Sequence, residues 1–364
     1  MSEKKVFLTG FPGFLTRHLV RRLAKSQDRR FVFLIQEHLR GKAEEALDDQ
    51  ERRTKGFKER ATLVSGDITK GPSLALSDED MEIAKDAQEV WHFAAIYDLS
   101  IDRSVAYRVN VVGTANVLDF CENLDSLRVL NYISTCYVAG NREGRIFEEE
   151  LDLGQGFKNH YESTKCWAEM EVRRRMARLP VTVFRPGIVV GDSRTGETDK
   201  YDGPYYLVRG LLRLPSFVPV PFVGEGAALV NLAPVDYTID AMNAISEDPH
   251  AVGMTFQLAD PNPHTAREIL QEMARLTGHR MLPLQIPQGI VSGVSGNKQI
   301  EELLQIPKET IVYFDHKAVY DTTNVDKFLA EKTIVCPDLM SYLPILVDYV
   351  RKNPEKGFLD GRKY

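Results

Sequence analysis

Short hydrophobic runs recur along the first half of the chain, and helix-like segments separate most of them. Such runs are typical of strands that are buried on both faces of a sheet. Strands that alternate with helices predict a parallel, doubly wound α/β sheet with right-handed crossovers. The runs that carry this prediction are Val6–Thr9, Phe31–Ile35, Ala61–Val64, Val90–Ala95, Arg128–Ile133 and Val181–Phe184.

The pattern becomes less regular beyond Gly191. Pro215, Pro219 and Pro221 disfavour a continuous helix or a central strand there. The last part of the chain is predicted to be mainly helical and to end in an apolar helix at 339–350. We therefore expect a Rossmann-type dinucleotide-binding domain and a smaller, mostly helical C-terminal substrate lobe. The expected bounds are 1–190 for the domain, with elements returning from about 228–260, and 191–364 for the lobe.

A turn that contains glycines follows the first predicted strand and precedes an amphipathic segment. This arrangement presents backbone N–H groups and the positive end of a helix to a pyrophosphate. Gly10 permits the tight turn, and Gly13 lets phosphates approach the backbone closely. Thr16 stands where the usual fingerprint has its third glycine. The turn predicts dinucleotide binding, and an ordinary strand–turn–helix is the alternative.

The end of the second predicted strand bears on the choice of cofactor. NAD-specific proteins commonly have an acid there that binds the ribose hydroxyls, whereas Gln36 and then Glu37 follow this strand. Arg17, Arg40 and Lys42 are basic residues at positions that suit a 2′-phosphate. We therefore expect NADP, and Glu37 keeps NAD open as an alternative.

Further candidate residues stand at the ends of other predicted strands. Asp67 and Ile68 follow the third strand, where they would make one polar and one apolar contact with the adenine; a plain strand terminator is the alternative. Ala94 and Ala95 end the fourth strand and are small enough to let a cofactor pass close to the backbone. Ligands of such sheets bind at the carboxyl ends of the strands, so these residues and Pro186 predict one shared site.

Tyr161 and Lys165 lie four residues apart in a predicted helix, which places them on one face. A fixed ammonium beside a tyrosine favours the phenolate, so we expect a lowered tyrosine pKa and a proton donor. The spacing alone is not specific, because Tyr313 and Lys317 repeat it. Position favours the first pair, since it follows Thr135 and the fifth predicted strand.

Composition and charge exclude several classes of function. The formal net charge of −6 argues against a nucleic-acid-binding protein, which usually carries a basic surface. Four widely spaced cysteines without a CxxC pair fit reduced thiols better than a zinc site or disulfides. We find neither a signal peptide nor an apolar run approaching the roughly 18 residues of a membrane helix, so we expect a cytoplasmic protein.

Some polar residues are expected to have structural roles only. His92 lies inside a predicted strand, which indicates a packed histidine, and no other group of histidines or acids has metal-ligand spacing. The acidic run at 148–150 and the basic cluster at 173–175 are interpreted as solvated faces.

The ordered set of motifs resembles the extended short-chain dehydrogenase/reductases. The chain looks most like their thioester-reductase and fatty-acyl-CoA-reductase branch. The general resemblance rests on the glycine turn, Asp67-Ile68, Ala94-Ala95, Asn110 to Thr114, Ser134-Thr135, Tyr161 with Lys165, and Arg185-Pro186-Gly187. The branch is indicated by Gly66 to Thr69, Leu74 to Ser77, Gly191 to Gly196, Pro234 to Tyr237, Tyr320 to Asn324 and Cys336-Pro337.

The resemblance implies roles for individual residues. Tyr161 would protonate a carbonyl oxygen while the nicotinamide gives hydride to its carbon, with Thr135 bonded to the same oxygen and Lys165 holding the ribose. Asn110 would brace the helix and support a proton relay. The cofactor-binding residues implied are Gly10, Gly13, Phe14, Leu15, Arg17, Gln36, Arg40, Asp67, Ile68, Ala94, Ala95, Tyr161, Lys165, Pro186, Gly187, Ile188 and Val189.

The expected function is NADPH-dependent reduction of a fatty-acyl or related acyl thioester to an aldehyde, with further reduction to an alcohol left open. The acyl-CoA or acyl carrier would arrive as a separate molecule, and the oligomeric state is not predicted. One alternative is a reductase or dehydrogenase of an aldehyde, ketone, sterol-like or sugar-nucleotide substrate. Another is a non-catalytic NADP-binding regulatory protein, which the complete Thr135, Tyr161 and Lys165 set disfavours.

Overall fold

A parallel sheet of seven strands organises the molecule, in the order β11-β7-β5-β4-β1-β2-β3. The computed structural model describes residues 3–98, 101–223, 226–286 and 316–356. All six strands predicted from the hydrophobic runs are present, and β11 joins them at one edge. Their bounds are β1 Lys4–Thr9, β2 Arg29–Ile35, β3 Ala61–Ser65, β4 Glu89–His92, β5 Val129–Ile133, β7 Val181–Pro186 and β11 Thr255–Leu258.

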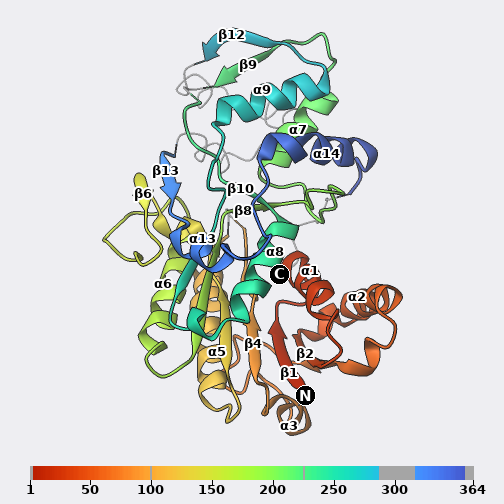
Figure 1. Ribbon diagram of the computed structural model, residues 1–364, viewed down its shortest axis with the longest axis vertical. Coiled ribbons are helices and arrows are strands. Elements are labelled where there is room, and N and C mark those ends of the chain that lie inside the picture. Colours follow the sequence, from red (N-terminus) through yellow and green to blue (C-terminus); the bar gives the residue numbers. More distant parts are fainter. Residues whose placement is uncertain (1–2, 99–100, 224–225, 287–315, 357–364) are drawn as a thin grey trace.

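Helices cover both faces of the sheet (Figure 1), which explains why the central strands are apolar in succession and do not alternate. One face is packed by α1 (Phe14–Leu23), α2 (Arg40–Arg53), α8 (Val235–Ser246) and α13 (Thr323–Leu329). The other is packed by α3 (Asp78–Ala84), α5 (Gly113–Glu122) and α6 (His160–Arg175). The predicted doubly wound α/β fold is therefore confirmed.

The second half of the chain builds a smaller body beyond the sheet, drawn at the top of Figure 1. Its helices share a separate apolar core that includes Leu211, Met273 and Leu346. The helices are α7 (Pro204–Arg213), α9 (Ala266–Thr277) and α14 (Leu339–Lys352). Short parallel strand pairs accompany them: β8 (Ile188–Val190) with β10 (Leu232–Pro234), and β9 (Val220–Val223) with β12 (Met281–Ile286).

The expectation of a mostly helical C-terminal part did not include these strand pairs. The proline-rich segment forms β9, whose partner in the described structure is β12 alone, so Pro221 occupies a two-stranded edge as its missing N–H requires. A further pair, β6 (Gly144–Ile146) with β13 (Ala318–Tyr320), joins segments far apart in the sequence. Short helical elements complete the description: η1 Glu37–Leu39, η2 Lys58–Arg60, α4 Arg103–Ala106, the π-helix η3 Tyr107–Val112, η4 Cys136–Ala139 and η5 Pro249–Ala251.

The interpretation of two charged runs as solvated faces was wrong in part. Glu148 is buried and accepts hydrogen bonds from the backbone N–H groups of Gln257, at 2.8 Å, and Asn324, at 2.6 Å. Arg173 donates through its guanidinium to Glu169 and to the carbonyl oxygen of Glu148. These charged side chains tie the loop before α6 to β11 and α13, because buried charges need fixed partners.

His92 is packed, as its place in a strand predicted. Its ring nitrogens lie 2.8 Å from the hydroxyl of Thr9 and 3.1 Å from that of Thr114. Burial lowers the pKa of His92 to about 3, so the ring is neutral. Among the described residues, histidines, cysteines and acids form no cluster of three suited to a metal ion.

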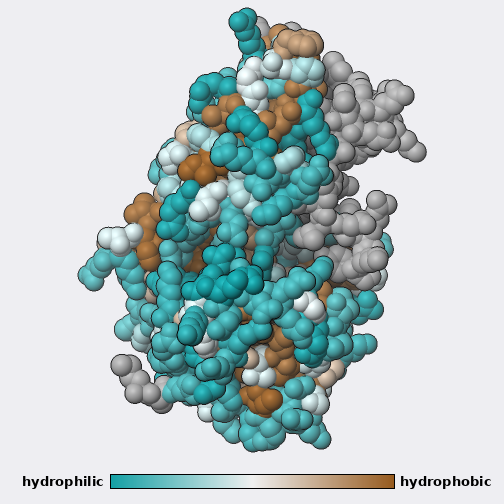
Figure 2. All heavy atoms as spheres, turned by 90° about the vertical axis from the view of Figure 1, so that its right-hand side faces the viewer, coloured by the Kyte–Doolittle hydropathy of each residue, from teal (hydrophilic) through white to brown (hydrophobic). Residues whose placement is uncertain are grey.

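The surface shown in Figure 2 is largely hydrophilic, and hydrophobic residues gather there in separate patches. Within the described part of the chain, no helix has both the length and the apolar character needed to cross a membrane.

Candidate active site

The turn between β1 and α1 brings the backbone close to the end of β4. Gly10 has a φ of +86°, and a Cβ atom there would lie 2.8 Å from the backbone nitrogen of Ala94. A Cβ atom on Gly13 would lie 2.7 Å from the carbonyl oxygen of Gly10. Both positions therefore require glycine, as the phosphate-binding prediction needed.

Thr16 has a structural role that explains the missing third glycine. Its buried hydroxyl lies 2.7 Å from the carbonyl oxygen of Gly10 and 3.0 Å from that of Gly13, so it braces the turn from inside. Gly13 caps α1 without any side-chain hydrogen bond. The first-turn N–H groups of α1 consequently have no capping side chain and suit an anion such as a pyrophosphate.

A large cavity of about 2010 Å³ runs along the carboxyl ends of the strands. It extends from the glycine turn to α7 and α9. Of the predicted site residues, all of which lie in the described structure, only Asn110 and Arg40 do not line it. The predicted residues that do line it are Gly10, Gly13, Phe14, Leu15, Arg17, Gln36, Asp67, Ile68, Ala94, Ala95, Thr135, Tyr161, Lys165, Pro186, Gly187, Ile188 and Val189.

Asp67 and Ile68 lie on the wall of this cavity beyond β3. The Asp67 carboxylate accepts hydrogen bonds of 2.8 Å from both the backbone N–H and the hydroxyl of Thr69. Asn116 donates a 2.7 Å hydrogen bond to the carbonyl oxygen of Ile68. The two residues are thus held in place by their neighbours, and the mostly buried Ile68 side chain packs close to Gly113.

Tyr161 and Lys165 stand on the first turns of α6, which Asn159 starts by accepting a 3.0 Å hydrogen bond from the backbone N–H of Glu162. Tyr161 shares a hydrogen bond with Thr135. Burial raises the pKa of Tyr161 above its ordinary value, and the contact with Thr135 opposes that rise. The hydroxyl is therefore protonated at neutral pH, as a proton donor must be.

Our expectation that Lys165 lowers the pKa of Tyr161 was wrong for this state of the protein. The Lys165 ammonium donates a 2.7 Å hydrogen bond to the carbonyl oxygen of Ile133 and a 3.2 Å bond to the hydroxyl of Tyr132. It also lies 4.7 Å from the centre of the Tyr132 ring. Burial lowers the pKa of Lys165 to about 8, although the Glu169 carboxylate opposes this. The Lys165 ammonium is anchored on β5. Its pKa lies closer to neutral pH than the pKa of Tyr161 does.

Asn110 braces the site without lining the cavity. Its side-chain oxygen accepts a 2.9 Å hydrogen bond from the backbone N–H of Ile96, just after β4. Its side-chain nitrogen donates to the hydroxyl of Thr164 at 3.0 Å and to the carbonyl oxygen of Ile96 at 3.3 Å. Asn110 thus links the loop after β4 to α6 between Tyr161 and Lys165, from within the π-helix η3.

Two of the three basic residues predicted for a 2′-phosphate, Arg17 and Arg40, are already paired, whereas Lys42 lines the cavity. Arg40 donates to Glu37 at 2.8 Å and to the hydroxyl of Ser65 at 2.9 Å, and the hydrogen bonds that Glu37 accepts from Arg40 and Ser65 lower its pKa to about 2. Arg17 forms an ion pair with Asp199, which belongs to a loop beyond β8. The cofactor end of the cavity therefore contains both signs of charge.

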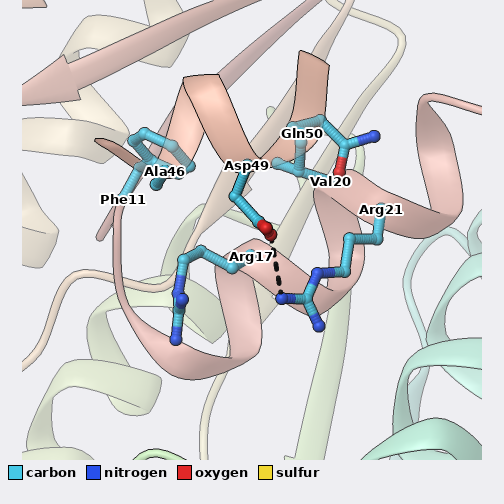
Figure 3. Close-up of a pocket in the computed structure, with 7 residues that line it drawn as sticks. All are labelled: Phe11, Arg17, Val20, Arg21, Ala46, Asp49 and Gln50. Carbon is cyan, nitrogen blue, oxygen red and sulfur yellow. Dashed lines mark hydrogen bonds and ion pairs between the residues drawn. The ribbon is translucent and has the colours of Figure 1, made fainter. Parts of the chain in front are cut away.

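Figure 3 shows a small cavity between α1 and α2 that adjoins this region. Arg21 is directed to Asp49, at 3.3 Å, and also bonds Glu197 at 3.2 Å. The Arg17 guanidinium points away from Asp49. Arg17 and Arg21 thereby both reach the loop that contains Glu197 and Asp199, although the sequence had suggested a ligand role for Arg17 alone.

Comparison with known proteins identifies the family. The sequence model of an NAD-binding family, described as Male sterility protein, matches residues 8–242. The chain belongs to this family. The matched stretch contains the glycine turn and the Thr135, Tyr161 and Lys165 set, so the predicted extended short-chain dehydrogenase/reductase relationship is confirmed.

Fatty acyl-CoA reductases are among the relatives of this chain. "Fatty acyl-CoA reductase wat" of Drosophila melanogaster is 26% identical over 286 residues, covering 68% of this chain and 54% of that protein. Human "Fatty acyl-CoA reductase 1" is 26% identical over 284 residues, covering 65% and 53%. The chain thus spans about half the length of these curated relatives.

A solved structure agrees with the fold. The terminal R domain from the myxalamid PKS-NRPS biosynthetic pathway is 24% identical, with a TM-score of 0.82 over 97% of this chain and 92% of that one. This likeness supports the α/β architecture of the Male sterility family member, including the body beyond the sheet.

Several cavity-lining residues of this family member were missed from the sequence. The ring of Tyr97 packs edge-on against Tyr161, with centroids 5.0 Å apart. Tyr137, Tyr206 and Asp202 also line the cavity, and burial raises the pKa of the Asp202 carboxyl. The sequence had suggested only an irregular, loop-like segment at 201–204. The one available signal in the sequence was the Tyr-Asp-Gly-Pro turn at 201–204.

The structure describes only one residue of the alternative pair Tyr313 and Lys317. Lys317 lies just before β13, and Tyr313 falls outside the described residues.

Proposed function

We propose that the protein is an NADPH-dependent reductase that converts a fatty-acyl or related acyl thioester to an aldehyde. The observation that carries the proposal is that Thr135, Tyr161 and Lys165 line the same cavity as the glycine turn of Gly10 and Gly13. One cavity can then hold a dinucleotide and a carbonyl substrate side by side. The similarity to fatty acyl-CoA reductases supports a thioester as that substrate.

The chain's own residues supply the acid chemistry. Bound NADPH supplies hydride to the thioester carbonyl carbon. Tyr161, neutral and bonded to Thr135, gives its proton to the carbonyl oxygen, and Thr135 stabilises the charge that develops there. As the carbon–sulfur bond then breaks, the proton on that oxygen passes to the departing sulfur, which releases the thiol and leaves the aldehyde. Lys165 holds the ribose of the cofactor and thereby sets its position relative to Tyr161.

Two parts of the chain would bind the cofactor and the substrate separately. Residues 1–190, with elements returning over 228–260, would bind the cofactor, and 191–364 would form the substrate lobe. The cavity wall in the substrate lobe includes Leu207 and Ile269, which suit an acyl chain. Arg17 would contact the 2′-phosphate of NADPH after leaving Asp199, which favours NADPH over NADH.

The test is to mix the purified protein with NADPH and a long-chain acyl-CoA, follow NADPH absorbance, and identify the product. Consumption of NADPH with release of aldehyde supports the proposal. A parallel reaction with the same acyl group on a carrier protein separates the two thioester sources. Turnover of free aldehydes or ketones, without turnover of any thioester, would contradict it.

A further inference from the structure

A buried ion pair lies directly behind the candidate active site. Glu169 and Arg185 are both fully buried, and Arg185 donates three hydrogen bonds to the carboxylate, of 2.6, 3.0 and 3.1 Å. Glu169 stands on α6, four residues after Lys165, and Arg185 stands on β7, next to Pro186. Neither side chain lines the cavity. The chemistry proposed above makes no use of them.

This pair fastens the elements that carry the three candidate catalytic groups. The hydroxyl of Ser134, which precedes Thr135, donates a 2.6 Å hydrogen bond to Glu169. Arg185 also donates to the carbonyl oxygen of Glu150, at 2.7 Å. One carboxylate thereby connects the end of β5, the helix α6 and the end of β7.

The pair also acts on charge. Lys165 is buried and lies one turn before Glu169 on the same face of α6, while it donates to Tyr132 on β5 and lies near His92 on β4. Burial keeps His92 neutral by lowering its pKa to about 3, and keeps Tyr132 neutral by raising its pKa. Glu169 is therefore the ionised acid among these neighbours. Although burial opposes its charge, Arg185 and Arg173 hold the pKa of Glu169 below its ordinary value.

We propose that Glu169 is a positioning residue that keeps the Lys165 ammonium charged, while Arg185 and Ser134 hold Glu169 one turn away and Arg185 keeps it ionised. The inference rests on the proposed role of Lys165 in holding the cofactor. An ion pair whose only task is packing could be replaced by apolar residues at little cost. A pair that sets the charge of Lys165 could not, because the lysine would lose the carboxylate that opposes its desolvation.

The test is the pH dependence of NADPH affinity, measured by fluorescence on the full chain across about pH 6 to pH 10. In the parent, affinity should fall as Lys165 loses its proton. In Glu169→Gln, the midpoint of that fall should lie about one pH unit or more lower. Glu169→Asp, which retains the charge, should restore most of the parental midpoint.

Glu169→Gln leaves Arg185 as a lone buried charge, so the double variant Glu169→Gln/Arg185→Met removes both and gives a second reading. It should show the same lowered midpoint, because Lys165 still lacks its carboxylate. The matched control is Glu148→Gln, another buried acid, whose carboxylate bonds backbone N–H groups and not Arg185. Its midpoint should equal that of the parent.

A double variant that folds and keeps the parental midpoint would overturn the inference. Failure of the proposed function is distinguishable, because NADPH binding needs no thioester. A shifted midpoint in a protein that reduces no thioester would sustain the role of Glu169 and reject the substrate.

Discussion

The hydroxyl oxygen of Thr16 lies 2.7 Å from the carbonyl oxygen of Gly10, across the turn that faces the dinucleotide end of the cavity. Thr16 is buried at the place where the usual fingerprint has a glycine. The threonine therefore replaces the close packing of a glycine by a hydrogen bond, which fixes the turn from behind.

Thr16→Val should weaken NADPH binding and lower stability. Valine keeps the shape of threonine but removes the hydroxyl, which loses its hydrogen bonds to the carbonyl oxygens of Gly10 and Gly13 at a cost of about 0.5–1.5 kcal/mol. Chemical denaturation and NADPH titration measure the two effects. Thr16→Ser, which keeps the donor, should bind nearly as the parent does; equal binding by the valine variant would remove the brace from the cofactor site.

Tyr161→Phe should abolish turnover while NADPH binding is retained. The phenol is the proposed proton donor, and loss of such a group typically costs about 10²–10⁴-fold in rate. Steady-state kinetics and NADPH titration measure the two properties. The control is Tyr107→Phe, an exposed tyrosine on η3 that does not line the cavity, which should leave the rate unchanged. Full activity in Tyr161→Phe would exclude this tyrosine as the donor.

NADPH affinity should fall as the pH rises through about 8, where buried Lys165 loses its proton. Unfolding does not cause this fall in affinity, because the titration of Lys165 changes folding stability in the opposite direction. The unfolded lysine keeps its proton up to its ordinary pKa of 10.5, so between the two values the unfolded chain binds more protons and this group favours the folded protein as pH rises. When both are measured across this pH window, NADPH affinity should therefore fall, whereas the titration of Lys165 should raise the melting temperature. Lys165→Met should bind NADPH weakly at every pH in the series.

Glu37→Gln should raise the preference for NADPH over NADH. Glu37 pairs with Arg40, and removing its charge both frees the guanidinium and lessens repulsion of a 2′-phosphate. The measurement is the ratio of the dissociation constant of NADH to that of NADPH, which should rise. Glu59→Gln, at an exposed acid beside β3, is the control and should leave the ratio unchanged. A fall in the ratio would show that Arg40 does not reach the phosphate.

Asn110→Ala should lower both stability and turnover. The side chain bonds Ile96 and Thr164, and losing it leaves the N–H of Ile96 without that partner, at about 1–3 kcal/mol. Thermal unfolding and kcat are the measurements. Asn123→Ala removes a single exposed bond to the carbonyl of Asp119 and should change neither. Unchanged kcat in Asn110→Ala would remove the brace from catalysis.

The sequence by itself determined the sheet and the end of it that binds ligands. Strands buried on both faces must be apolar in succession, so Phe31–Ile35 and Val181–Phe184 were recognisable without neighbours. Gly10 and Gly13 were recognisable for a similar reason, because no side chain fits their backbone. The four-residue step from Tyr161 to Lys165 fixed a common face of α6.

Only the tertiary structure decided which partners the charged groups have. Burial and pairing depend on elements that are distant in the sequence, so Glu148 looked solvated, and Arg17 gave no sign of Asp199. The same holds for the pKa of Tyr161, since desolvation depends on the walls around a group and not on its spacing from Lys165. Periodicity reports one face of one element, whereas the electrostatics of a site require every element that surrounds it.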